Sequence, residues 1–354
     1  MDQRSQGSYR LNPPTSGPPL VSPKGGNQSE RESRITNLME LSIIIVSWNA
    51  KKYLVECLES LAPFCTGRAC EIIVVDNASA DGTCELVASR FPEVKLIQTG
   101  SNLGFAKGNN IGIAHSSGEY VCLVNSDVKF VHDCFTPMLA YLRQHPDVGM
   151  LGPKMLDLNL RVARSTMRFP TIWNSLCRAL GLDCIFKGSK ILGGQMVTDF
   201  DHEHTAEAEV LNGWFLLLRR TALDLVGLLD ERFFMYGEDI DWCYRFQQAG
   251  QRKVFFAEAE AIHYGGASSA QAPVRFQIEM YRANCQYWEK HHGRRARLLY
   301  LSIVWLHQAV RLLGCLLLLA AKAQRSETLF KMKKSLACMG WVMGSSTYRL
   351  APSR

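Results

Sequence analysis

Four short apolar segments constrain the fold of this 354-residue chain more than any other feature. Each segment stops at polar residues or glycines, and a stretch with helical spacing follows each of the first three. The segments are residues 41–46, 71–75, 94–98 and 120–124. Strands that alternate with helices in this way predict an α/β fold with a mostly parallel sheet, right-handed crossovers and helices on both faces.

Polar side chains gather where two of these predicted strands end. Asn125, Ser126 and Asp127 follow the fourth segment directly, and Asp76 and Asn77 follow the second. In an open parallel sheet, ligands bind in the crevice outside the carboxyl ends of the strands. A carboxylate in that crevice can hold a divalent cation, and the cation can hold a phosphate. Aspartates at strand ends also cap helices and turns, and the residues alone leave that alternative open.

A second concentration of acidic residues lies in the segment DERFFMYGEDIDWCYR, residues 230–245. Five carboxylates fall within twelve residues, beside an apolar stretch at 233–236: Asp230, Glu231, Glu238, Asp239 and Asp241. A carboxylate against an apolar wall has its pKa raised toward the range that suits a general base. Helical spacing begins directly after this point, so these acids can also serve only the helix dipole.

Two common kinds of site have no support in the sequence. Gly104, Gly108 and Gly112 match neither the G-x-G-x-x-G pattern of dinucleotide-binding folds nor the G-x-x-x-x-G-K-[ST] pattern of P-loops. The twelve cysteines are scattered singly and form no C-x-x-C pair. This distribution fits reduced thiols better than a disulfide framework or a zinc site.

The positive charge of the chain belongs to its C-terminal part. Residues 290–354 carry twelve basic side chains and one acid, Glu327, whereas the rest of the chain has 28 basic and 32 acidic residues. This asymmetry predicts an anionic surface as the partner of the tail and argues against a nucleic-acid groove across the body. Residues 1–38 are rich in proline and glycine and predict a disordered leader without a secretory h-region.

An apolar stretch lies within this basic tail, at residues 298–321. It is long enough to cross a bilayer, but only if His307, Gln308 and Arg311 are tolerated in its middle. An amphipathic helix in the plane of the membrane, flanked by the basic residues, is the alternative. The sequence leaves both open and favours association with the cytoplasmic face of a membrane.

In their order along the chain, SIIIVSWN, VVDNASADGT, NLGFAKGNN, LVNSD, GWFLLLRR, LLDERFFMYGEDIDWCYR and HYGG resemble the family 2 glycosyltransferases of the GT-A fold. The likeness is greatest to the bacterial rhamnosyltransferase-like branch and covers about residues 41–287. It implies a leader at 1–38, a GT-A nucleotide-binding domain at 39–290 and a helical, membrane-associating extension at 291–354.

The resemblance also implies roles for individual residues. Asp239 matches the catalytic base, with Glu238 beside it, and Asp127 and His263 match the protein ligands of a Mg or Mn ion at the diphosphate. The residues implied to surround the sugar nucleotide are Ser47, Asn49, Asp76, Asn77, Asn102, Lys107, Asn110, Asn125, Ser126, Gly213 and Trp214. Asn125 replaces the first acid of the family's DxD motif, which predicts weaker metal binding or binding that depends on the nucleotide.

The expected activity is an inverting transfer of rhamnose or another hexose from a dTDP- or UDP-sugar. The acceptor is a saccharide or a lipid-linked molecule in cell-surface polysaccharide synthesis, at the cytoplasmic face of the cell membrane, with the protein peripheral or anchored by a single span. One base and one displacement predict inversion at the anomeric carbon. Two alternatives are a non-catalytic nucleotide-sugar binding or scaffold protein and a nucleotidyltransferase on a similar sheet.

Overall fold

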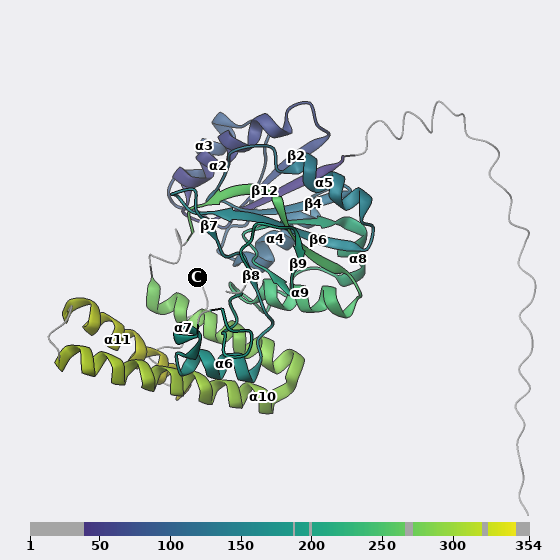
Figure 1. Cartoon of the computed structure of the whole chain (residues 1–354). Helices are drawn as coiled ribbons and strands as arrows, with labels where there is room; N and C mark the ends of the chain where they lie inside the picture. The colour runs from purple at the N-terminus through teal and green to yellow at the C-terminus, as the bar shows by residue number, and fades with distance from the viewer. Residues whose placement is uncertain (1–38, 187, 198–199, 266–271, 321–324, 345–354) are drawn as a thin grey trace, which may run out of the picture. The chain divides into compact units, whose positions relative to one another are not determined.

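The computed structural model describes residues 39–186, 188–197, 200–265, 272–320 and 325–344. The leader predicted at residues 1–38 lies outside them. The described residues build one mixed, mostly parallel sheet with helices on both faces and a helical layer on one side (Figure 1).

The sheet has a parallel half and a mixed half. In spatial order its strands are β3 (Lys95–Gln98), β2 (Cys70–Asp76), β1 (Leu41–Ser47), β4 (Tyr120–Asn125), β11 (Phe215–Arg219), β6 (Val148–Leu156), β12 (Arg252–His263) and β5 (Val128–Phe130). The first four run parallel to one another, and so do β6 and β12, whereas β11 is antiparallel to both of its neighbours. The four apolar segments of the sequence are thus the four strands of the parallel half.

Short strands complete the sheet edges. β7 (Val162–Ala163) pairs with β6, and β9 (Ala206–Glu207) pairs with β12. A separate two-stranded ribbon joins β8 (Thr166–Met167) to β10 (Val210–Leu211).

Helices cover both faces of the sheet because its central strands are apolar on both sides. Leu41, Ile43 and Ile45 pack into one core with α2 (Lys51–Cys65), α3 (Thr83–Arg90) and α5 (Phe135–Gln144), whereas Ile44 packs into the other. That second core contains α4 (Phe105–Ala114), α8 (Arg220–Val226) and α9 (Glu238–Gln248). Alternate residues of a strand point to opposite faces, so one apolar run supplies two cores.

The carboxyl ends of three neighbouring strands lie level with one another. Ser47 at the end of β1 pairs with Asp76 at the end of β2, and Val46 pairs with Asn125 at the end of β4. The polar residues that follow these strands in the sequence therefore meet at one edge of the sheet.

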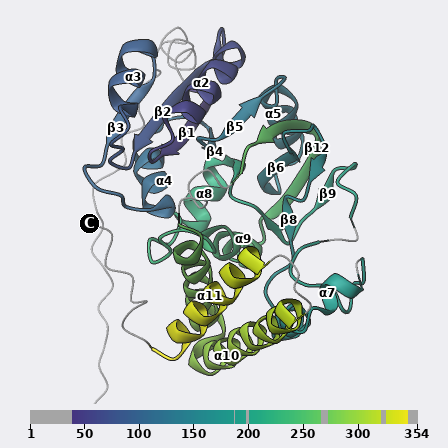
Figure 2. The same ribbon diagram turned by 90° about the vertical axis from the view of Figure 1, so that its left-hand side faces the viewer.

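Four helices form a layer beneath the sheet in Figures 1 and 2: α6 (Ile172–Ala179), α7 (Leu182–Ile185), α10 (Pro273–Ala320) and α11 (Arg325–Val342). Gly293, with φ 82° and ψ 174°, breaks α10 into two helices. The break lies two residues beyond the predicted domain boundary, but α10 itself begins at Pro273, inside the segment predicted to be catalytic. α10 packs against both α11 and α6. By length and composition, Pro273–Leu319 includes a stretch apolar enough to cross a membrane.

Candidate active site

A cavity of about 500 Å³ opens at the carboxyl ends of β1 and β4. It brings together residues from ten separate segments of the chain. The predicted site residues that line it are Asn77, Asn102, Asn125, Ser126, Asp127, Gly213, Trp214, Glu238, Asp239 and His263. The two acids on which the sequence analysis depends most, Asp127 and Asp239, thus share one cavity although 112 residues separate them along the chain.

The first polar group of the cavity joins the turn after β4 to the end of β12. β5 and β12 pair in antiparallel register, which sets His263 opposite Val128. His263 Nε2 then lies 3.1 Å from Asp127 Oδ1 and 3.3 Å from Asn125 Nδ2, and its ring stacks on Trp214. Asn125 Oδ1 is buried without a hydrogen-bond partner among the described residues. A carboxylate, an imidazole and an unpaired amide oxygen therefore face one small space.

The second polar group lies at the N-terminus of α9. Asp239 accepts hydrogen bonds from two backbone N–H groups, that of Gly213 at Oδ2 (3.1 Å) and that of Ile240 at Oδ1 (2.8 Å). Both bonds favour the ionised carboxylate, as does the positive end of the helix dipole.

The two acids of this helix differ in their surroundings. Glu238 is 5% exposed, and its Oε2 has no partner among the described residues. Burial, and then the neighbouring Asp239, raise the pKa of Glu238 well above its usual range. Burial also raises the pKa of Asp239, but its two backbone hydrogen bonds oppose that shift. Of the pair, Glu238 holds a proton more firmly, and Asp239 is the carboxylate free to accept one.

Asp76 and Ser47 lie beneath the cavity and not in its lining. Each is 1% exposed, and Asp76 Oδ1 and Ser47 Oγ have no partner among the described residues. The other carboxylate oxygen of Asp76 accepts a hydrogen bond from the backbone of Ser79 (2.9 Å). Asn49, also predicted to bind the donor, instead accepts one from the backbone of Ala80 (2.8 Å). These residues shape the loops after β1 and β2.

The structure does not bring Lys107 and Asn110 into the cavity lining. Asn110 is buried, its amide donates to Leu229 O (2.9 Å), and its Oδ1 accepts from Leu229 N (3.1 Å). Lys107 lies 3.5 Å from Glu231 on the surface. The geometry gives both side chains the task of fastening α4 to the loop that precedes α9, and it does not support the predicted donor contact.

Sequence reasoning missed the close contact between the loop before α4 and the loop before α9. Phe105 N donates to Phe234 O (2.7 Å), and Gly104, with φ 84°, lies directly against that carbonyl. The sequence did contain a signal for such close contacts, which was the regular spacing of Gly104, Gly108 and Gly112. Gly108 and Gly112 likewise lie where a Cβ would collide with Val46 and Ile44 of β1.

Gly104→Ala is therefore expected to lower the free energy of unfolding by about 2 to 4 kcal/mol, because it combines a disfavoured φ with a Cβ placed 2.3 Å from Phe234 O. Gly100→Ala is the matched control, since Gly100 also has a positive φ (71°) but nothing within 4 Å of an added Cβ. Urea unfolding measures the free energy of unfolding of both variants. The difference between them separates the cost of the contact with Phe234 O from the cost of the backbone strain. Equal losses in the two variants would show that the loop contact contributes nothing.

One wall of the cavity is rich in methionine, and no pattern in the sequence predicted it. Met167, Met196, Met235 and Met280 line it together with Tyr236. They come from β8, the segment after α7, the loop before α9 and the first half of α10. Methionine adapts to irregular apolar partners, so this wall suits an acceptor or its carrier better than a phosphate.

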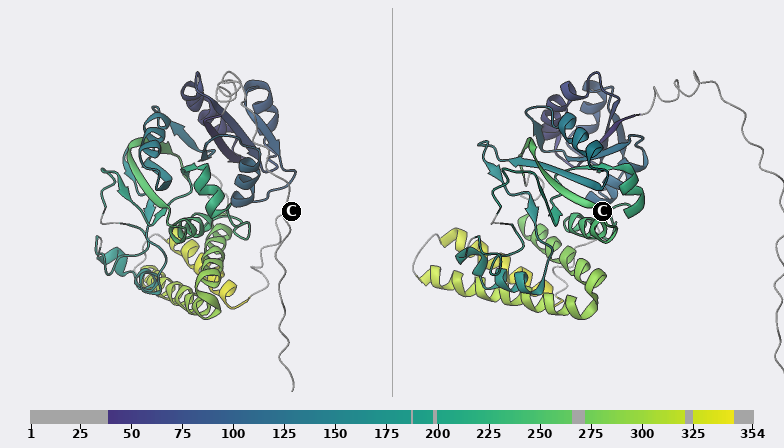
Figure 3. Two further views of the ribbon diagram at one scale, coloured as in Figure 1. Left: turned by 90° about the vertical axis from the view of Figure 1, so that its right-hand side faces the viewer. Right: turned by 45° about the vertical axis from the view of Figure 1, so that its right-hand side comes forward.

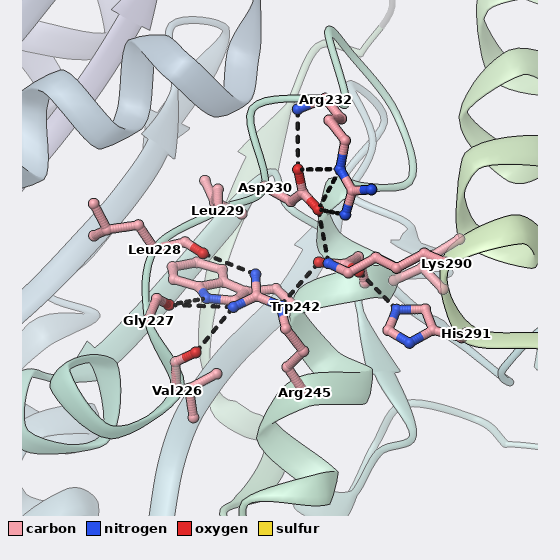
Figure 4. Close-up of polar contacts among 12 residues, drawn as sticks. Val226, Gly227, Leu228, Leu229, Asp230, Arg232, Trp242, Arg245, Lys290 and His291 are labelled. Carbon is pink, nitrogen blue, oxygen red and sulfur yellow. Dashed lines mark hydrogen bonds and ion pairs between the residues drawn. The ribbon is translucent and has the colours of Figure 1, made fainter.

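A cluster of charged side chains fastens α9 to α10 (Figure 4). Asp241 is fully buried and contacts two cations, Arg245 (2.9 Å) and Lys290 (2.6 Å), and the imidazole of His291 (2.7 Å). Lys290 also reaches Asp230 (2.8 Å), in the loop that leads to α9. Since Asp241 lies two residues after Asp239, this cluster fixes the end of the helix on which the predicted base sits.

Comparisons with known proteins identify relatives of this chain. Residues 42–186 match the family model described as Glycosyl transferase family 2. Over 249 residues the chain is 31% identical to the N-acetylglucosaminyl-diphospho-decaprenol L-rhamnosyltransferase of Mycobacterium tuberculosis, across 66% of this chain and 79% of that protein. It is 28% identical over 251 residues to a low-salt glycan biosynthesis hexosyltransferase of Haloferax volcanii, across 69% and 73%.

Among solved structures, the mannosyltransferase of Pyrobaculum calidifontis in complex with GDP-Man and Mn²⁺ aligns with a TM-score of 0.48. The alignment has 15% sequence identity and covers 87% of this chain and 88% of that one.

The mixed, mostly parallel sheet, the cavity at its carboxyl strand ends and these relatives together define a sugar-transferring enzyme. The chain belongs to the family 2 glycosyltransferases, in their rhamnosyltransferase-like branch, and is a hexosyltransferase. The fold class and family predicted from the sequence are confirmed, and the relatives favour this activity over the scaffold and nucleotidyltransferase alternatives.

Proposed function

We propose that this enzyme transfers a hexose, with rhamnose as the first candidate, from a dTDP- or UDP-sugar to a saccharide or lipid-linked acceptor, with inversion. The observation that carries the proposal is the convergence of Asp127 and Asp239 on one cavity. The mycobacterial relative is named as a rhamnosyltransferase acting on a decaprenol-linked acceptor, and the haloarchaeal one as a hexosyltransferase of glycan biosynthesis. These names support the proposed sugar and acceptor classes.

The donor diphosphate is assigned to the space beside Asp127, His263 and Asn125. Oxygen donors and one imidazole form a ligand set that suits Mn²⁺ or Mg²⁺, and the unpaired Oδ1 of Asn125 fits the need for one more ligand. A cation bound there would neutralise the charge that develops on the departing nucleoside diphosphate. The described residues contain no cluster of three or more His, Cys, Asp or Glu side chains, so the cation needs oxygens of the nucleotide as well.

Asp239 is assigned the role of general base. Its two backbone hydrogen bonds orient the carboxylate beside the cavity and favour its ionised form, which can accept the proton of an acceptor hydroxyl. The hydroxyl oxygen attacks the anomeric carbon from the side opposite the diphosphate, so the new bond forms as the old one breaks. A single displacement of this kind inverts the configuration of that carbon.

Residues 291–354 are assigned to membrane association at the cytoplasmic face. The excess of basic over acidic residues in this segment and the apolar second half of α10 support the assignment. A decaprenol-linked acceptor, such as the mycobacterial relative uses, is itself held at a membrane.

The donor assignment is tested by thermal unfolding with a panel of nucleotide sugars, each with and without Mn²⁺. One donor plus Mn²⁺ should stabilise the protein by about 2.7 kcal/mol when the donor is at a hundred times its Kd. Asp127→Ala should abolish the increment that depends on Mn²⁺, because it removes the charged ligand. Asp224→Ala, which removes an exposed carboxylate of α8, is the control. No stabilisation by any donor, or an unchanged Mn²⁺ increment in Asp127→Ala, would contradict the assignment.

A further inference from the structure

The second half of α10, residues 294–319, turns an apolar face to solvent. Leu298, Leu313 and Leu317 are 59%, 60% and 65% exposed. Trp305 and Leu316 belong to the same face, and Ser302 is the only polar residue among the exposed positions from 298 to 319. A contiguous exposed patch of large apolar side chains on one helix marks an interaction surface.

The polar residues in the middle of this helix face the protein. Gln308 is 2% exposed and donates to Tyr281 Oη in the first half of α10 (2.7 Å). Burial, together with Arg311 and Arg178 of α6, lowers the pKa of His307 to about 4, which leaves its ring neutral. The sequence left a membrane span and an in-plane helix open because of His307, Gln308 and Arg311. These residues lie on the side of the helix that faces the protein.

This arrangement favours a helix that lies flat. A helix that crossed a bilayer would have to leave its partners, including the stack of Trp288 on Tyr300 across the break at Gly293. It would also bring Gln308 and Arg311 into lipid, where an unpaired polar or charged side chain is costly. An in-plane helix keeps every one of these contacts and buries only its outward leucines.

Two neighbouring elements extend the exposed apolar surface. α11 exposes Leu329, Phe330 and Leu336, and Ile185 and Phe186 at the end of α7 are 70% and 47% exposed. The right panel of Figure 3 shows α10 and α11 as a layer beneath the sheet, with α6 and α7 beside them.

The charges of this layer identify its partner. The described part of residues 290–344 carries nine Lys and Arg side chains and one acid, Glu327. Arg294, Arg295 and Lys333 are exposed beside the apolar face. Anionic lipid headgroups attract such residues by about 1 kcal/mol each. A second copy of the chain would instead bring like charges together.

The same layer forms one wall of the active-site cavity. Gln195 and Met196, which follow α7, line the cavity together with Met280 and Asn284 of the first half of α10. Asp239 lines that cavity as well. A molecule held in a bilayer against this layer would therefore lie next to the cavity that contains the proposed base, Asp239.

We propose that the end of α7, the second half of α10 and α11 form one docking surface that lies flat on an anionic bilayer and presents the cavity to an acceptor carried on a lipid. The proposal that this surface docks on a bilayer depends only on its exposed apolar and basic residues. The proposal that the acceptor is carried on a lipid rests on the proposed function.

Vesicle flotation of the full chain tests the docking surface. The protein should float with vesicles of phosphatidylcholine and phosphatidylglycerol, bind vesicles of phosphatidylcholine alone more weakly, and be released by an alkaline carbonate wash. Leu313→Glu combined with Leu317→Glu should weaken partitioning by about a hundredfold, because each leucine contributes roughly a factor of ten on leaving water. Ile185→Glu combined with Phe186→Glu should weaken it as well.

Leu225→Glu is the matched control, since Leu225 of α8 is 64% exposed but outside the docking surface. Flotation that survives the carbonate wash would overturn the proposal in favour of a span. Wild-type protein that stays unbound, or variants that float as well as Leu225→Glu, would also overturn it. A dimer in light scattering that the leucine variant dissociates, without flotation of the wild type, would identify a second copy as the partner.

The acceptor is tested separately by incubating the enzyme with isolated cell membranes and a radiolabelled donor chosen by thermal unfolding. Label in the organic extract supports a lipid carrier, and label only in water-soluble polysaccharide excludes one. A protein that floats but binds no donor would disprove the proposed function and leave the docking surface standing. A protein that binds donor but never floats would disprove the docking surface and leave the proposed function standing.

Discussion

Asp239→Asn is expected to lower kcat for sugar transfer by about a hundredfold to ten-thousandfold, the usual contribution of a general base. The asparagine amide has the same shape and its oxygen can still accept the hydrogen bond from Gly213 N, but it cannot take a proton from the acceptor. Donor binding, measured as thermal stabilisation, should therefore change little. Unchanged turnover in this variant would remove Asp239 from the role of base.

Glu238→Gln is the matched control for this experiment. Burial and Asp239 raise the pKa of Glu238 well above its usual range, which favours the protonated side chain, and glutamine resembles that form. Most of the activity should remain. If Glu238→Gln loses as much turnover as Asp239→Asn is expected to lose, while Asp239→Asn stays active, the two roles are reversed.

The pH dependence of kcat/KM provides a second check. A general base works in its ionised form, so activity should fall as the pH drops through the pKa of Asp239 in the free enzyme. Burial raises that pKa, although the N–H groups of Gly213 and Ile240 oppose the shift. The acidic limb of the profile should thus lie at higher pH than an ordinary aspartate would give, and it should vanish from the residual activity of Asp239→Asn.

Asp241→Ala is expected to lower the free energy of unfolding by about 3 to 5 kcal/mol, the cost of removing one partner from a buried ion pair. Asp241 is fully buried, and its loss leaves Lys290 and Arg245 with uncompensated charge where α9 meets α10 (Figure 4). Urea unfolding measures the effect. Asp230→Ala, which removes the more exposed partner of Lys290, should cost less. A loss no larger than that of Asp230→Ala would contradict this role.

The same cluster predicts how stability depends on pH. Burial alone would raise the pKa of Asp241, but hydrogen bonds from His291 and Lys290 and the charge of Arg245 outweigh it and hold the pKa below its ordinary value. A lowered carboxyl pKa contributes stability that is complete above the unfolded-state value, near 3.9, and is lost as the pH falls through the folded-state value. Wild type should lose this contribution in acid, whereas Asp241→Ala should not.

Particular residues show where the sequence was informative about the site. Asp127 and Asp239 could be chosen because each follows a recognisable structural boundary, the end of an apolar strand and the start of a helix. Lys107 and Asn110 were predicted from the resemblance to the family, yet the structure turns Asn110 toward Leu229 and Lys107 toward Glu231. Local spacing does not say which of several polar side chains points at a cavity.

The C-terminal helices show the same limit. The sequence predicted a basic, apolar segment but left a span and an in-plane helix open, because composition does not tell which side of a helix meets protein. The contact between Gln308 and Tyr281 resolves the two faces, and it joins two halves of α10 that are separated by the break at Gly293.

By itself, the sequence determined the alternation of strands and helices, the polar residues at the strand ends and the family, since these depend on short-range periodicity and on residues close together in the chain. Only the tertiary structure decided that His263 meets Asp127, that Gly213 meets Asp239 and that the α7 segment and α10 share a cavity wall. Those contacts join residues far apart in the chain, and they form only when the whole core packs and closes the loops between them.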